Sequence, residues 1–292
     1  MTAPRDRWEL LEDVTTRLED AGVPTPDVDA RLLVEALEER FGDLSRCDVA
    51  VLDGLVERRA AREPLQVVLG RTTFRWVDLE VVAGVFVPRP ETEVVAGLAV
   101  EACRGRRQPV VLEPCTGSGA IACALLVEVP GVHVVATDLD EAAVALARRN
   151  VARVGSGVAS PAAWRVRDGA DVEVLHGALL EPVNPALRGR VDVLVSNPPY
   201  LPSADLPDMQ PEVAAHDPHA ALFGGPDGHE VVDALLASAG AWLRPGGTVV
   251  LEVDDRRAHD AAVRAEGLGL VDVRVVPDLA GRDRAVVARR PG

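Results

Sequence analysis

The sequence predicts an α/β protein, in which an open, doubly wound sheet of seven strands follows a small helical module. Three observations predict this class. From residue 109 onward, short β-prone runs alternate with segments of helical spacing. Only residues 277–283 separate the last two β-prone runs, which is too short for a parallel crossover, so that final pair is expected to be antiparallel. Residues 6–63, by contrast, show helical spacing alone.

Three helices are expected in the N-terminal module. Thr25 is expected to cap the second helix, with Pro26 in its first turn and Gly42 just past its end. Asp48 is expected to cap the third helix, and Pro64 to end it. A module of this size has a thin core when alone, so we expect it to pack on its neighbour or on a partner.

The chain is expected to divide into a helical domain at residues 1–72, a β-hairpin linker at 73–88 and an α/β domain at 89–292. In the linker, two β-prone runs at 79–82 and 85–87 flank Ala83-Gly84, which predicts a hairpin turn there. Pro90 is then expected at the first position of a helix.

The elements of the α/β domain follow from the alternation of patterns. Strands are predicted at 109–113, 132–137, 172–175, 191–196, 248–254, 270–276 and 284–290, and helices at 118–128, 140–151, 229–243 and 256–267. A parallel sheet with one antiparallel strand near its edge favours the Rossmann-like class I methyltransferase architecture over a dinucleotide dehydrogenase.

Composition excludes several classes of protein. The formal net charge is −15 and the chain has no lysine, which argues against direct binding of nucleic acid. The four cysteines form no Cys-x-x-Cys pair, so we expect neither a disulfide framework nor a metal site. With no apolar leader and no apolar run of about 18 residues, we expect a reduced cytoplasmic protein that does not enter a membrane.

A glycine-rich loop follows the first predicted strand, and a helix follows the loop. Its glycines let the backbone approach a ligand closely, and the helix N-terminus offers free N–H groups. Asp138 ends the next strand, where an acid can accept hydrogen bonds from both ribose hydroxyls, while Asp140 is the better helix cap. The loop alone fits NAD or FAD as well, and Ala122 occupies the third glycine position of that pattern. The loop reads Cys115-Thr116-Gly117-Ser118-Gly119.

The tetrapeptide Asn197-Pro198-Pro199-Tyr200 directly follows a predicted central strand. The Asn197 side-chain oxygen and the Pro198 carbonyl can each accept one N–H of a planar amide or amine. The two prolines preorganise these acceptors, and Tyr200 can form a wall against the planar group. A plain turn stiffened by proline is the alternative, but open α/β sheets bind ligands at the carboxyl ends of their strands.

Together, the loop and the tetrapeptide predict methyl transfer from S-adenosylmethionine to nitrogen. The sulfonium already activates the methyl group, so the protein's main task is to align the nitrogen with the S–CH₃ bond. No strong base is required before transfer, because the proton can leave afterwards.

These residues resemble those of the bacterial PrmC/HemK family, which methylates glutamine in the Gly-Gly-Gln motif of peptide chain release factors. The resemblance covers nearly the whole chain and includes the specific segment Pro88-Arg89-Pro90-Glu91-Thr92-Glu93. It is carried by residues 63–70, 85–93, 115–119, 197–200, 221–228 and 278–284.

The resemblance implies an enzyme that methylates the N5 atom of that glutamine and uses its helical domain to recognise the release factor. We expect the enzyme to act as a monomer, although the sequence does not determine its oligomeric state. It implies that Phe86 and Arg89 help Asn197, Pro198 and Tyr200 to bind the glutamine, with Pro199 completing the catalytic turn. The cofactor residues it implies are Glu113, Cys115, Thr116, Gly117, Ser118, Gly119, Asp138, Leu139, Ala178, Leu179 and Asn197.

The chain departs from the family pattern at several positions. Glu113 replaces the usual Asp, and Gly177-Ala178 replaces a Gly-Asp pair, so a side-chain contact to adenine is lost. Trp76 occupies a family glycine position, and the segment 155–171 is longer than expected. These departures leave other functions open. The first alternative is a paralogue that acts on another protein or on a small-molecule amide. A nucleic-acid adenine methyltransferase is the second alternative, and a non-catalytic binding module is the third.

Overall fold

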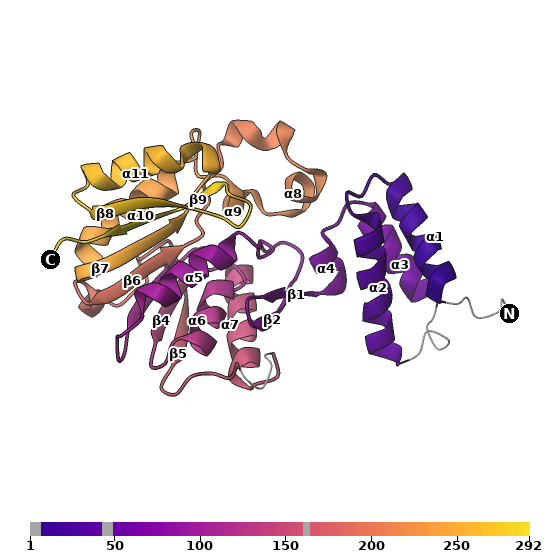
Figure 1. Cartoon of the computed structure of the whole chain (residues 1–292), viewed down its shortest axis with the longest axis horizontal. Helices are drawn as coiled ribbons and strands as arrows, with labels where there is room; N and C mark the ends of the chain where they lie inside the picture. The colour runs from indigo at the N-terminus through magenta and orange to yellow at the C-terminus, as the bar shows by residue number, and fades with distance from the viewer. Residues whose placement is uncertain (1–6, 43–48, 160–163) are drawn as a thin grey trace. The chain divides into compact units, whose positions relative to one another are not determined.

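The computed structural model describes residues 7–42, 49–159 and 164–292, and its contacts divide the chain into two compact units (Figure 1). The larger, α/β unit comprises Thr72–Met209 and Asp217–Gly292. The helical unit comprises the chain up to Arg71 together with Gln210–His216, a segment that the sequence did not assign to it. The predicted cap Asp48 lies outside the described residues.

The helical unit is built around the three helices that the sequence predicts. Gly42 ends α2 in the left-handed conformation, with φ 73°, and its N–H bonds to the Glu38 carbonyl, as its position predicts. Thr25 stands at the N-cap of α2 but forms no capping hydrogen bond; its hydroxyl donates to the Asp29 carboxylate instead. The unit contains α1 (Arg7–Asp20), α2 (Pro26–Phe41), α3 (Val49–Ala60), α4 (Leu65–Leu69) and α8 (Pro211–His216).

A buried network of ion pairs joins α8 to the N-terminal helices. Arg59 is only 5% exposed, and its guanidinium bonds to Asp29 at 2.6 Å and to Glu212 at 3.0 Å. Arg62 binds both oxygens of Glu212, at 2.8 and 2.7 Å. A carboxylate buried among apolar helices is tolerated only with such partners, so Glu212 is what commits α8 to this unit.

The hairpin at the start of the α/β unit lies earlier in the chain than predicted. Its strands are β1 (Arg71–Phe74) and β2 (Val77–Glu80), with Arg75 at φ 51° in the turn between them. Ala83-Gly84 does form a turn, but residues 85–87 are irregular, so the prediction of a strand there was wrong. Their β-like apolar character has another cause, because Val85 packs against α7.

The seven-stranded sheet has the order β5-β4-β3-β6-β7-β9-β8. The strands from β5 to β7 are parallel, whereas β9 runs antiparallel to both β7 and β8, which confirms the predicted fold class. The strands are β3 (Val110–Pro114), β4 (His133–Asp138), β5 (Asp171–His176), β6 (Val191–Ser196), β7 (Leu243–Glu252), β8 (Val271–Pro277) and β9 (Asp283–Arg289).

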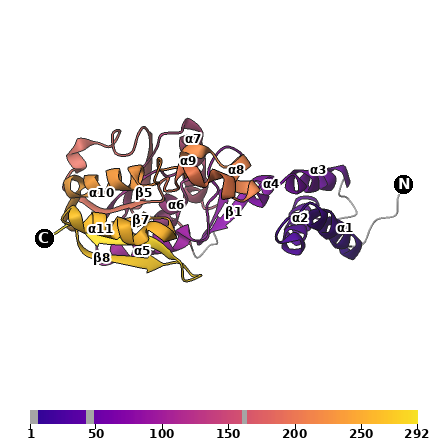
Figure 2. The same ribbon diagram turned by 90° about the horizontal axis from the view of Figure 1, so that it is seen from above.

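Helices cover both faces of this sheet. Val111 and Val193 face the cluster formed with α5 (Thr92–Ala102), α6 (Ala120–Glu128) and α7 (Glu141–Gly155). Leu112 and Leu194, one residue on in each strand, face α10 (Glu230–Trp242) and α11 (Ala258–Gly267). Figure 2 shows α10 and α11 side by side, and α11 is the helix that covers the edge strand β8.

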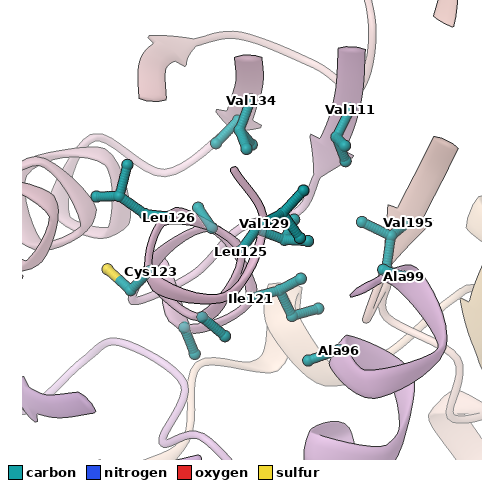
Figure 3. Close-up of a cluster of buried hydrophobic side chains, with 14 of the residues drawn as sticks. Ala96, Ala99, Val111, Ile121, Cys123, Leu125, Leu126, Val129, Val134 and Val195 are labelled. Atoms are coloured by element: carbon teal, nitrogen blue, oxygen red, sulfur yellow. The ribbon is translucent and has the colours of Figure 1, made fainter. Parts of the chain in front are cut away.

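On the face of the sheet that α5, α6 and α7 cover, α6 is the central helix. Its residues from Ala120 to Val127 are all buried, as expected of a helix that is apolar on every side. Figure 3 shows Ile121 and Leu125 of this helix among side chains of the sheet and of α5. The helix that carries the glycine-rich loop at its N-terminus is therefore held on all sides, which makes the loop a rigid platform.

Several element boundaries differ from the prediction. The α5 helix begins at Thr92, two residues after Pro90, and β7 begins at Leu243 rather than at residue 248. Two short helices, α8 and α9 (His219–Leu222), lie in a proline-rich stretch where none was predicted. Among the described residues, no helix is long and apolar enough to cross a membrane.

We expect Glu212→Gln to lower the free energy of unfolding of the helical unit by about 3 kcal/mol, because Arg62 loses its carboxylate partner and the buried Arg59 keeps only Asp29. Hydrogen exchange of amides in α2 and α3 would measure this unit separately. As a control, Glu39→Gln removes an ion pair on the surface and should cost less than about 1 kcal/mol. Equal effects of the two changes would contradict the importance of the buried network.

The same network predicts a dependence on pH. Burial alone raises the pKa of Glu212, but hydrogen bonds from Arg62 and Arg59 outweigh it and lower the pKa to about 2. Because the pKa is lower in the folded state, this stabilisation is complete above about pH 4.5 and is lost as the pH falls towards 2. Glu212→Gln should flatten that part of the stability curve.

Candidate functional site

A cavity of about 480 Å³ lies in the α/β unit, at the carboxyl ends of parallel strands. Glu113 of β3, Asp138 of β4 and Asn197 after β6 all line it. The chain order reverses between the neighbouring strands β3 and β6, which leaves a crevice where open α/β sheets bind ligands. The glycine-rich loop and the Asn197 turn thus meet at one site.

Asp138 joins the glycine-rich loop to the end of β4. One of its carboxylate oxygens accepts the Gly117 N–H at 2.8 Å, and the other accepts the Asp140 N–H at 3.0 Å. Asp140 caps α7 by accepting the Ala142 N–H, which confirms the predicted cap. Each oxygen of Asp138 keeps a further lone pair, so the carboxylate can still accept from the hydroxyls of a ligand.

The loop depends on unusual backbone conformations. Gly119 has φ 80°, and a Cβ there would lie 3.1 Å from the Cβ of Ala147, so glycine lets α6 and α7 approach each other. Cys115 also has a positive φ, 59°. Burial raises the pKa of its thiol to about 12, so the side chain is a protonated packing group and not a nucleophile.

Glu113 is a buried acid on the cavity wall. One of its oxygens accepts the Thr116 hydroxyl at 2.9 Å, while Oε2 has no hydrogen-bond partner among the described residues. Burial raises its pKa to about 8. A cationic ligand would satisfy this carboxylate and favour its ionised form, so the acid fits the positively charged cofactor that the sequence predicts.

The opposite part of the cavity is apolar. Leu139, Ala178 and Leu179 line it, so the position that lacks the family's acid presents only a methyl group and a backbone. Leu179 has φ 45°, and its carbonyl accepts a hydrogen bond from the Thr137 hydroxyl. A flat aromatic ring could be held here by contact with these side chains, without a carboxylate.

The turn at Asn197 is held from outside by the glycine-rich segment 221–228. The Leu201 N–H bonds to the Leu222 carbonyl at 2.9 Å, and the Gly224 N–H bonds to the Leu201 carbonyl at 3.0 Å. A Cβ at Gly224 would lie 2.5 Å from the Pro199 carbonyl oxygen, so a side chain there would displace the turn. The two backbones therefore pack directly on one another.

The structure brings most of the predicted site residues to this cavity, but not all. Arg89 pairs with Asp217 at 2.6 Å, and its guanidinium lies 5.3 Å from the ring centroid of Phe86. The Tyr200 hydroxyl donates to Glu252 at 3.1 Å. The predicted residues outside the lining are Arg89, Gly119, Pro198 and Tyr200, and those in it are Phe86, Glu113, Cys115, Thr116, Gly117, Ser118, Asp138, Leu139, Ala178, Leu179, Asn197 and Pro199.

Sequence reasoning missed two residues beside the Asn197 turn. Thr92 begins α5, lines the cavity and accepts a hydrogen bond from the Asn197 amide nitrogen. Glu252 ends β7 and accepts the Tyr200 hydroxyl. An acid at the carboxyl end of a central strand was a usable signal for Glu252, whereas only the fold brings Thr92 next to Asn197.

Two of the departures from the family pattern, Trp76 and the long segment 155–171, lie next to each other in the structure. The rings of Trp76, in the hairpin turn, and Trp164, in the long segment 155–171, stack with centroids 4.4 Å apart and planes 3° apart. The Asp78 N–H also bonds to the Ala159 carbonyl. The long segment therefore packs on the hairpin through Trp76. Residues 160–163 of that segment lie outside the described part of the chain.

Comparison with known proteins gives consistent results. The family model "Methyltransferase small domain" matches residues 83–208. A release factor glutamine methyltransferase of Streptomyces coelicolor is 41% identical, over 96% of this chain and 98% of the relative. One from Deinococcus radiodurans is 42% identical, over 97% and 98%. A methyltransferase structure from Pyrococcus furiosus has a TM-score of 0.51 at 22% identity, over 74% of this chain and 90% of that chain, and supports the fold.

We expect Asp138→Ala to weaken binding of S-adenosylmethionine by about tenfold to a hundredfold, because it frees Gly117 and removes the carboxylate that we expect to accept the ribose hydroxyls. Isothermal titration calorimetry would measure the dissociation constant. Glu141→Ala, an exposed acid in the first turn of α7, is the matched control and should leave binding unchanged. A dissociation constant that Asp138→Ala does not change would remove this residue from the site.

Proposed function

The chain belongs to the family of release factor glutamine methyltransferases, and we propose that it methylates the side-chain amide nitrogen, N5, of the glutamine in the Gly-Gly-Gln motif of peptide chain release factors. The methyl donor is S-adenosylmethionine. The observation that carries the proposal is the position of Asn197, which lines the same cavity as Glu113 and the glycine-rich loop. An acceptor for an amide N–H and a site for a cationic cofactor are therefore adjacent.

The cofactor residues divide into a charged and an apolar part. Glu113 and Asp138 offer carboxylates to the cationic and ribose groups, while Leu139, Ala178 and Leu179 offer apolar contacts to adenine. When bound, S-adenosylmethionine supplies a methyl group that its sulfonium activates. The protein supplies the position of both partners.

Asn197 and Pro198 hold the amide that is to be methylated. The nitrogen of a carboxamide is a poor nucleophile, because its lone pair is delocalised into the carbonyl group. Asn197 lines the cavity, so its Oδ1 can accept one N–H; Pro198 lies outside the lining, so its carbonyl is the second acceptor only where the bound substrate reaches it. With both N–H bonds held, the nitrogen is fixed with its lone pair directed at the methyl group. Pro199 stiffens the turn, and Phe86 contributes an aromatic wall to the cavity.

The remaining parts of the proposal concern the partner. A protein substrate suits a net charge of −15, which disfavours direct binding to nucleic acid. We assign recognition of the release factor to the helical unit, whose helices are distinct from the catalytic fold. We further propose that the enzyme acts as a monomer in the cytoplasm, where release factors work.

Co-expression with a release factor tests the function directly. We expect mass spectrometry to find the added mass of one methyl group on the glutamine of the Gly-Gly-Gln motif. A factor with that glutamine replaced by alanine is the control and should stay unmodified. If an enzyme that binds S-adenosylmethionine leaves the motif unmethylated, the substrate is another protein or a small amide.

Asn197→Ala tests the role of the acceptor. We expect kcat to fall by about a hundredfold to a thousandfold, which is the usual effect of removing one preorganised hydrogen-bonding group, with binding of S-adenosylmethionine retained. Single-turnover methylation of the release factor would measure the transfer step. Asn184→Ala, at an exposed cap of a short 3₁₀ helix, is the matched control and should keep full activity. Full activity of Asn197→Ala would contradict the proposed role of Asn197 as the acceptor of the substrate N–H.

A further inference from the structure

The side-chain amide of Asn197 has two faces with opposite chemistry, and only one of them suits the proposed reaction. Its oxygen can accept an N–H from the substrate amide, whereas its NH₂ group would oppose that N–H. The two orientations have nearly the same shape, so the protein needs a hydrogen-bonded neighbour to select one. The residue in contact with the Asn197 nitrogen, at 3.1 Å, is Thr92.

Thr92 is placed to make this selection. It is the first residue of α5, is only 4% exposed, and its hydroxyl oxygen accepts the Nδ2–H of Asn197. A hydroxyl has one hydrogen to donate and can accept on its oxygen. Thr92 therefore acts as an acceptor toward Asn197 whenever its own hydrogen is directed elsewhere.

Glu252 is the acceptor that suits that hydrogen. It ends β7, is only 1% exposed, and its Oε1 accepts the Tyr200 hydroxyl, while its Oε2 has no hydrogen-bond partner among the described residues. The Thr92 side chain lies near enough to lower the pKa of Glu252, and because an ionised carboxylate can only accept, a hydrogen bond between the two runs from the Thr92 hydroxyl to Glu252. The direction of each hydrogen bond in this series follows: Asn197 donates to Thr92, and Thr92 donates to Glu252. The Asn197 oxygen is then the atom left for the cavity.

The same carboxyl group also holds the other end of the catalytic turn. The Tyr200 hydroxyl donates to Glu252 Oε1 at 3.1 Å. Asn197 and Tyr200, the first and last residues of the turn, are thus both connected to one buried group. This contact explains why the Tyr200 hydroxyl faces the interior and why the ring lies outside the cavity lining.

The surroundings of Glu252 leave its ionised, accepting form predominant above about pH 7. Burial raises its pKa to about 7, while hydrogen bonds from Thr92 and Tyr200 and the charge of Arg284 act to lower it, and Glu91 acts to raise it. Arg284 is itself buried and lies 3.7 Å from Asp278. The charge of a buried arginine thus supports the ionised form of Glu252.

We propose that Thr92 and Glu252 are positioning residues for methyl transfer, which orient the Asn197 amide with its oxygen toward the substrate nitrogen and anchor the turn through Tyr200. This inference rests on the proposed function, because it assigns the orientation a role in binding an amide. It also gives the Thr92 position of the Pro-Arg-Pro-Glu-Thr-Glu segment a physical task.

Thr92→Val tests the proposal with little change of shape, since it replaces the hydroxyl by a methyl group. We expect kcat to fall by about tenfold to a hundredfold, as is typical when a supporting hydrogen bond is lost, while the dissociation constant of S-adenosylmethionine stays unchanged. Thr92→Ser is the matched control: it keeps the hydroxyl and should retain most of the wild-type kcat. A Ser variant as slow as the Val variant would overturn the proposal.

A double-mutant cycle shows whether Thr92 acts through Asn197. In the Asn197→Ala background, Thr92→Val should cause no further loss of kcat, because the group that it orients is absent. Losses that multiply in the double variant would mean that Thr92 acts on something else. Glu252→Gln should lower kcat as Thr92→Val does. The NH₂ group of the new glutamine side chain can donate to Thr92, which would reverse the direction of the hydrogen bonds between positions 252, 92 and 197.

A measurement without substrate separates this inference from the proposed function. The side-chain NH₂ signals of Asn197, identified by their loss in Asn197→Ala, should be sharp and protected from exchange in the wild type and in Thr92→Ser. They should broaden or exchange faster in Thr92→Val. Identical signals in all three would overturn the orientation, whatever the substrate. Failure of the wild type to methylate a release factor, with these signals as expected, would overturn only the proposed function.

Discussion

The parallel pairing of β3 with β6 is the constraint on which the site depends. It sets Val111 beside Val193 and Leu112 beside Leu194, so the two strands end at the same edge of the sheet. The neighbours of each strand lie on opposite sides, which opens the crevice between them. The cofactor loop follows one strand and the acceptor turn follows the other. Their approach is thus a property of the sheet and not of either motif.

Rigid support holds both motifs of the site. The buried helix α6 carries the glycine-rich loop, and the backbone of segment 221–228 packs directly on the Asn197 turn. Behind the turn, Glu252 accepts the Tyr200 hydroxyl and Thr92 accepts the Asn197 amide N–H. Such support is what methyl transfer to a weak nucleophile demands, because the reaction depends mainly on the position of the reacting atoms.

Buried carboxylates in this protein serve different purposes according to their partners. Two arginines hold Glu212 ionised, and it ties α8 to the helical unit. Among the described residues, no cation pairs with Glu113, which, like Glu252, keeps one oxygen without a hydrogen-bond partner; unlike Glu252 it faces the cavity, which suits a charged ligand. Glu252 stands between these cases, with hydroxyl donors and a nearby arginine. The pKa of each acid depends on its surroundings: cations lower it for Glu212, whereas burial raises it for Glu252, which has hydroxyl donors, and for Glu113, which has no cationic partner.

The sequence by itself determined the class of fold, the positions of the seven strands and the location of the cofactor loop and the acceptor turn, because periodicity, proline and glycine act locally. It also placed the cap at Asp140 correctly. Only the tertiary structure decided that residues 85–87 are irregular, that α8 packs with the N-terminal helices, and that Thr92 and Glu252 meet the catalytic turn. Those features join residues far apart in the chain, and no local pattern records a hydrogen bond between them. The chemistry was thus visible in the motifs, while the direction in which Asn197 presents its amide depends on buried partners that only the folded sheet brings together.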